Sequence, residues 1–383
     1  MVELCKDAKV RLAATACFSA DYAEAREKFF AAVRHRRGQL HSYVHPTAYG
    51  SKGEALSIDV AILGPVDAAN TLLVISGTHG LEGPCGSAAQ IGWLLSDHAQ
   101  KLPENTNVVM IHALNPWGYS HGFRTTENNV DLNRNFIDFD GARPENTHYG
   151  DLHAIRTPSA WTPEGLERID AGLQAFADKM GAQIMIDTIS RGQYTHSNGI
   201  NYGGHAREWS NVTLERIVAE HLNHAQRVGI IDWHTGLGEY GQSFFLCFND
   251  DGSALQKRAA AWWTEEKILG QELFGAGRPS YTGLVFYGVQ SFLKDRPLCG
   301  AVVEFGTRGF EMAKMLHLDR WLRYEGAPGS SAHDMLRLDL ADSFVPFEML
   351  WRQNVLDESL RITQQALAGV GAWTDDATIL RSA

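Results

Sequence analysis

The first residues of chemical interest are a histidine and a glutamate three positions apart, His79 and Glu82, in the segment SGTHGLEG at 76–83. An imidazole and a carboxylate are both ligands of Zn²⁺, and the glycines of the segment allow the backbone to turn tightly around an ion. An HxxE match is weak by itself, because a turn histidine followed by a helix-start glutamate has the same spacing. The pair indicates a metal site only if a third ligand lies close to it in the fold.

A candidate third ligand, His234, lies in the segment DWHTG at 232–236, at the end of an apolar run. On a strand, Asp232 and His234 point to the same face. The aspartate can therefore orient the imidazole or lie beside a second cation. The alternative is a strand-end histidine whose hydrogen bonds are satisfied by that aspartate.

Glu304 ends another apolar run, in the segment VVEFGT at 302–307. A carboxylate there would be partly desolvated, which raises its pKa. A raised pKa suits a general base or acid that works near neutral pH. The competing interpretation is a strand-end carboxylate that pairs with Arg308 or with a helix terminus.

A polar stretch with the sequence RTTENNVDLNRNF, at 124–136, carries two arginines, Arg124 and Arg134, and several amides. It is too polar for a core and too poor in Lys and Pro for a generic linker. Guanidinium groups suit carboxylates and developing oxyanions. The stretch therefore favours recognition of an anionic group.

These segments share one position in the expected fold, at or just beyond the C-terminal end of a strand. In open α/β sheets, that edge is where ligands bind. A helix at 84–98, opening at Pro84, separates two of the strands, and this rhythm predicts parallel strands in a covered sheet. Apolar runs and period-two alternation predict strands at 56–63, 71–76, 107–112, 228–234, 244–248 and 299–305.

The sequence thus predicts an α/β fold, with a mixed, largely parallel sheet, helices on both faces, and insertions. We expect a single catalytic domain over 1–383, with a core at about 20–310. Residues 137–205 are polar and irregular, with a helix near 163–180, and are interpreted as an insertion over the sheet. Further helices are expected at 21–36, 213–226 and 253–270, and in a C-terminal tail at 343–370.

The composition excludes some classes of function. With 34 basic and 45 acidic residues the formal net charge is −11, which is not the footprint of a nucleic-acid-binding protein. Five widely spaced cysteines without a CxxC argue against a disulfide scaffold and a cysteine zinc site. No convincing signal or transmembrane segment occurs, so we expect a cytoplasmic protein that acts at no membrane. The oligomeric state is left open.

Taken together, HxxE, an arginine, DLNRNF, a strand-end histidine and a strand-end glutamate, in this order, resemble the zinc carboxypeptidase superfamily. YAEAREKF, GTHGLEG, HALNPWGY and DWHTGLGEYG look more like a largely uncharacterised bacterial carboxypeptidase-like family. The EFGT and DWHTG segments are also similar to the aspartoacylase and succinylglutamate desuccinylase branch. One departure is Leu81, where digestive carboxypeptidases carry an arginine.

The resemblance implies a role for each matching residue. His79, Glu82 and His234 would bind one Zn²⁺ per chain, and Asp131 would hydrogen-bond the rear of His79. Glu304 would take a proton from the metal-activated water and pass it to the leaving amine.

Other residues would handle the substrate, a small peptide or an N-acyl amino acid. Arg124 would stabilise the oxyanion, and Asn133 and Arg134 would hold a substrate carboxylate. A tyrosine often lines such sites, and Tyr287 and Tyr281 are both candidates. The implied activity is hydrolysis of an amide bond next to a free carboxylate, with N-acyl amino acid deacylation as the alternative.

Two other motifs and one other class of protein compete with this interpretation. His205 and Glu208 form a second HxxE, but it follows DLNRNF, and no apolar strand leads into it. Ser120 lies in a GxSxG match that lacks the expected helix after it. A zinc-binding module without catalysis is the remaining alternative, and a second cation near Asp232 stays open.

Overall fold

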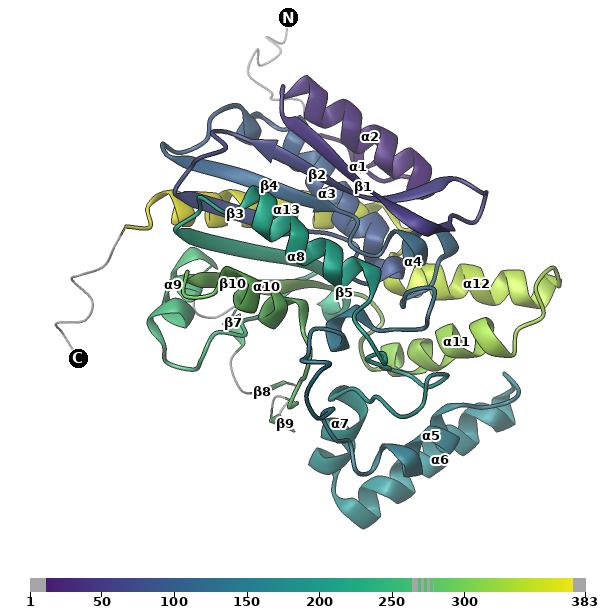
Figure 1. Ribbon diagram of the computed structural model, residues 1–383. Coiled ribbons are helices and arrows are strands. Elements are labelled where there is room, and N and C mark those ends of the chain that lie inside the picture. Colours follow the sequence, from purple (N-terminus) through teal and green to yellow (C-terminus); the bar gives the residue numbers. More distant parts are fainter. Residues whose placement is uncertain (1–11, 264–267, 270–271, 274–275, 278, 375–383) are drawn as a thin grey trace, which may run out of the picture.

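The computed structural model describes residues 12–263, 268–269, 272–273, 276–277 and 279–374 (Figure 1). Its main element is an eight-stranded sheet with the order β1-β2-β4-β3-β5-β10-β6-β7. A separate pair, β8 and β9, is antiparallel. The strands are β1 (Gln39–Tyr49), β2 (Ala55–Leu63), β3 (Asn70–Ile75), β4 (Thr106–His112), β5 (Arg227–Tyr240), β6 (Ser243–Leu246), β7 (Ile268–Leu269), β8 (Glu272–Leu273), β9 (Ala276–Gly277) and β10 (Leu298–Gly306).

The centre of the sheet is parallel and its flanks are mixed. Strands β4, β3, β5 and β10 run parallel to one another. The pairs β1–β2, β2–β4 and β10–β6 are antiparallel, and β7 is parallel to β6. Every residue of β3, β4 and β10 is buried, as expected of apolar strands covered on both faces. Because β3, β5 and β10 are parallel, their C-terminal ends meet at one edge of the sheet.

Helices cover both faces, which confirms the expected α/β class. Helices α2, α3 and α13 pack with one set of alternating strand residues, and α8 and α10 pack with the other (Figure 1). The helices are α1 (Ala14–Cys17), α2 (Tyr22–His35), α3 (Gly83–Leu95), α4 (Pro116–His121), α5 (Tyr149–Arg156), α6 (Pro163–Met180), α7 (Ala182–Ser190), α8 (Trp209–His221), α9 (Ala254–Trp263), α10 (Val285–Leu293), α11 (Met312–Tyr324), α12 (Ser331–Phe344) and α13 (Met349–Gly371).

The insertion at 137–205 is more helical than its sequence suggests. Helix α6 was expected, but α5 and α7 also form. Figure 1 shows α5, α6 and α7 together at the lower right, near α11. Lys314 of α11 and Asp170 of α6 form an ion pair of 3.3 Å, so the insertion contacts the helices that follow β10.

One expected helix needs a corrected boundary, and one strand was not expected. The helix expected over 253–270 is present as α9 up to Trp263, but Ile268–Leu269 forms β7, while 264–267 and 270 lie outside the described residues. Strand β1 was not expected at all. The C-terminal tail is helical as expected, in α13.

In the described residues, no helix is both long and apolar enough to cross a membrane. The single-domain interpretation stays a prediction.

Candidate metal centre

The ends of three parallel strands bring the candidate residues together. His79 follows β3 and precedes a short 3-10 helix, η1 (Gly80–Glu82), which carries Glu82. His234 lies in β5, directly opposite Glu304 of β10 in the strand register. Paired residues of neighbouring strands point to the same face, so Glu304 and His234 are side by side.

Two histidines converge on one carboxylate. His79 Nδ1 lies 2.8 Å from Glu82 Oε1, and His234 Nδ1 lies 2.8 Å from Glu82 Oε2. One ligand atom from each of the three residues lies within 4.8 Å of the other two, and all three residues are buried. The structure therefore assembles three donors from positions up to 155 residues apart (234 − 79).

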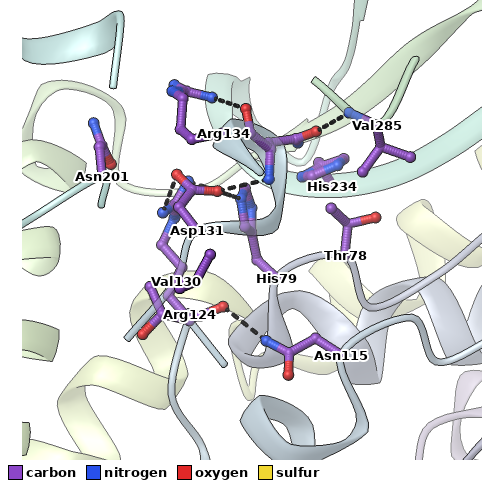
Figure 2. Close-up of polar contacts among 12 residues, drawn as sticks. Thr78, His79, Asn115, Arg124, Val130, Asp131, Arg134, Asn201, His234 and Val285 are labelled. Atoms are coloured by element: carbon purple, nitrogen blue, oxygen red, sulfur yellow. Dashed lines mark hydrogen bonds and ion pairs between the residues drawn. The ribbon is translucent and has the colours of Figure 1, made fainter. Parts of the chain in front are cut away.

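The far nitrogen of each imidazole lies beside an aspartate. His79 Nε2 lies 3.0 Å from Asp131 Oδ1, and His234 Nε2 lies 3.0 Å from Asp232 Oδ2. These contacts turn both Nδ1 atoms toward Glu82, and Figure 2 shows Asp131 beside His79. Thr78, which the sequence did not single out, donates 2.9 Å to Asp232 Oδ1. Its position directly before His79 was the only available signal.

The charges of this cluster depend strongly on one another. Burial alone would raise the pKa of Glu82, but His79 and His234 hold it well below its ordinary value. Burial would lower the pKa of His234, yet Asp232 and Glu82 raise it well above the ordinary value. A histidine nitrogen must lose its proton before it can bind a metal. A cation bound here would therefore replace the proton that Asp232 and Glu82 favour on His234.

The donor set fits zinc. Two imidazole nitrogens and one glutamate form a three-ligand set that leaves further positions open, as in catalytic zinc sites. Each imidazole is oriented by a carboxylate, which is the usual support for a metal-binding histidine. In the part of the chain that the structure describes, this is the one group of metal-ligating side chains, and it does not include Asp232.

Asp131 provides a test of this support. We expect Asp131→Asn to weaken zinc binding by about 10–100-fold, because the neutral amide polarises His79 less. Zinc affinity can be measured by competition with a chromogenic chelator. The matched control is Asp140→Asn, an exposed aspartate of the same region, which should bind zinc as the wild type does. Equal affinities of the two variants would contradict the role assigned to Asp131.

Glu304 is buried beside the cluster rather than paired with an arginine. Burial, followed by the charge of Glu82, raises the pKa of Glu304 to about 8. The backbone N–H of Leu237 donates to Glu304 Oε2 at 3.4 Å. The pairing with Arg308 considered from the sequence is wrong, because Arg308 instead pairs with Asp339 and Asp342.

Arg124 lies behind His79. Its Nη1 donates to Asp131 Oδ2 at 2.8 Å, and its Nη2 lies 2.8 Å from His79 Nε2, the ring nitrogen that faces away from Glu82. In this structure Arg124 thus neutralises Asp131 and contacts the rear of the imidazole. Its role at an oxyanion stays a prediction that would require its side chain to turn.

Asn133 and Arg134 both lie in the short 3-10 helix η3 (Leu132–Arg134). Asn133 Oδ1 accepts a hydrogen bond of 2.9 Å from the backbone N–H of Val285, and Arg134 donates to the carbonyl oxygens of Ser190 and Asn133. Among the described residues no carboxylate pairs with Arg134. A buried guanidinium in that state favours an incoming anion.

The two candidate tyrosines differ in position. The guanidinium of Arg134 lies 5.2 Å from the ring centroid of Tyr281. Tyr287 instead packs on Phe248 and Phe286, with ring centroids 6.0 Å away in each case. Of the two candidates, Tyr281 is thus the one that lies against Arg134, and a substrate-binding role for Tyr287 stays a prediction.

The competing motifs have ordinary structural partners. Glu208 accepts hydrogen bonds from Thr126 Oγ1 and Asn128 Nδ2, and His205 is exposed. Ser120 lies inside α4 and not at a strand-to-helix turn, and it hydrogen-bonds Glu54. Within the described chain, neither motif assembles a metal or nucleophile site.

The architecture and the buried His-Glu-His cluster define an α/β protein with a candidate metal centre at one sheet edge. The sequence matches the family model described as a protein of unknown function (DUF2817) over residues 18–358, so the chain belongs to that family. A comparison with curated proteins found no match.

Several solved structures are similar in fold. Thrombin activatable fibrinolysis inhibitor is 10% identical, with 92% of this chain and 74% of that chain covered and a TM-score of 0.48. Carboxypeptidase A from Helicoverpa armigera is 14% identical, with 84% and 73% covered and a TM-score of 0.43. A Shewanella frigidimarina protein assigned as a succinylglutamate desuccinylase/aspartoacylase is 16% identical, with 81% and 73% covered and a TM-score of 0.35.

Proposed function

We propose that the protein is a zinc-dependent hydrolase that cleaves an amide bond next to a free carboxylate. The observation that carries the proposal is the convergence of His79 Nδ1 and His234 Nδ1 on the carboxylate of Glu82, with Glu304 opposite His234. A metal site needs the three donors, and hydrolysis additionally needs a base. The three donors and the candidate base Glu304 are all buried at the sheet edge where ligands bind in α/β folds.

The protein's own groups would divide the reaction between them. When bound, zinc lowers the pKa of water and polarises a carbonyl group. Glu304 would accept the proton of the attacking water and deliver it to the leaving amine, and its raised pKa suits both transfers. Asp131 and Asp232 would keep His79 and His234 oriented throughout.

Recognition of the carboxylate would fall to Arg134 and Asn133. Burial lowers the pKa of Arg134, which records the cost of keeping its charge away from water. A substrate carboxylate would offset that cost. Tyr281, against the guanidinium, would lie beside the bound group. Peptides and N-acyl amino acids both present an amide next to a carboxylate.

The test combines metal content with turnover. We expect about one zinc per chain in purified protein. We also expect hydrolysis of a substrate from a panel of small peptides and N-acyl amino acids. A chelator should stop turnover and zinc should restore it, whereas a serine-directed phosphonate should have no effect. Active protein without metal would overturn the mechanism, and zinc-loaded protein inactive on the whole panel would favour a non-catalytic module.

A further inference from the structure

A second polar cluster lies away from the metal ligands, between α5 and α11. Tyr149, His153 and Arg156 are spaced by four and three residues, so they follow one side of α5. The ring of His196 lies 4.2 Å from that of His153, and Arg156 Nε lies 3.2 Å from His317 Nε2. We call these five residues the α5 cluster.

The α5 cluster has more hydrogen-bonding groups than partners. His153 Nδ1, Arg156 Nη1 and His317 Nδ1 are shielded from solvent and have no hydrogen-bond partner in the described part of the protein. Arg156 and His317 are each only 1% exposed. Buried polar groups in native proteins nearly always have a partner, so three unsatisfied nitrogens in one place indicate a missing ligand or water.

The charge of the α5 cluster points to an anion. No described carboxylate forms an ion pair with Arg156. Burial lowers the pKa of Arg156, Tyr149 opposes this effect, and Arg124 adds to it. Burial also lowers the pKa of His317, and the charge of Arg156 contributes. Buried charges are normally paired, and here the positive charge lacks its partner.

Access and geometry agree with a ligand site. His153 and His196 are only partly buried, whereas Arg156 and His317 lie deeper, so the cluster leads inward from the surface. Arg156 uses Nε for His317 and keeps Nη1 for another acceptor.

We propose that the α5 cluster binds a small oxyanion of the phosphate or carboxylate type, at a site separate from the metal centre. Guanidinium and imidazole N–H groups are the donors that bind such oxyanions most strongly. The site lies between α5 of the insertion and α11, and it does not depend on the proposed hydrolase activity.

The test is the thermal unfolding of the full chain in inorganic phosphate, in acetate and in chloride at equal ionic strength. With the anion well above its Kd, at about 20 mM, we expect the wild-type midpoint to rise by about 2–4 °C over chloride. Phosphate and acetate together distinguish the two kinds of oxyanion. In Arg156→Met the rise of the unfolding midpoint should fall to about a third or less of the wild-type rise. The reason is the loss of about one charge-assisted hydrogen bond to the anion.

The matched control is Arg168→Met, an exposed arginine on α6 of the same insertion, which should respond as the wild type does. Salt effects, and any anion bound at the metal, would remain in Arg156→Met, so the difference between variants isolates the α5 cluster. If Arg156→Met does not fold, His153→Gln at the entrance should also show a reduced rise. An undiminished rise in the folded variant, or no rise in the wild type, would overturn the proposal.

Discussion

Replacing Glu304 with glutamine is expected to lower kcat by at least about 10³-fold while zinc stays near one per chain. The amide has the shape of the carboxyl group, but it cannot accept the proton of the attacking water. Glu304 is not one of the three converging donors, so metal binding should survive. Steady-state turnover and metal analysis on the same preparation measure both quantities.

The control for this change is Glu311→Gln. Glu311 is an exposed glutamate soon after β10, so the same exchange of Glu for Gln is made without reaching the cluster. Its kcat and zinc content should match the wild type. Turnover of Glu304→Gln within about tenfold of the wild type would show that another group moves the proton. Loss of zinc would show instead that Glu304 holds the metal.

The central strands could be predicted because their sequences are apolar throughout. Strands β3, β4 and β10 are buried at every position, so the apolar runs in their sequences directly predict buried strands. Strand β1 was missed because it is an edge strand with a half-exposed, polar sequence and Pro46 within it. Its place depends on pairing with β2, for example Gln39 with Ile62, and that pairing is a tertiary contact with no local signal.

The convergence of the candidate metal ligands was predictable for a different reason, namely that their motifs were expected at strand ends. His79 and Glu82 stand between the end of β3 and the start of α3, and His234 lies two residues beyond the last residue of β5 that pairs with β3. Parallel strands bring those points together. The position of Arg124 behind His79 could not be seen, because motif order says nothing about where a side chain points. The α5 cluster was also invisible, since Arg156 and His317 lie within helices and not at strand ends, and they meet only in the folded chain.

Replacing His79 with alanine is expected to weaken zinc binding by more than about 100-fold, beyond the range for a lost supporting hydrogen bond, and to abolish turnover. One of three donors disappears, and two donors cannot hold the ion as firmly. The fold should survive, because each remaining buried charge keeps a partner. Asp131 retains Arg124 at 2.8 Å, and Glu82 retains His234 at 2.8 Å. Circular dichroism and chelator competition measure the two outcomes separately.

The chain supplies its own control in the second HxxE motif. His205 has the same sequence spacing to a glutamate as His79, but it is exposed, and Glu208 is occupied by Thr126 and Asn128. His205→Ala should therefore bind zinc and turn over substrate like the wild type. The same spacing contributes to a converging set of donors in one place and to none in the other, because only His79 lies where β5 supplies a third donor. Zinc lost from His205→Ala but kept by His79→Ala would move the metal to the other motif and remove the basis of the proposed hydrolase.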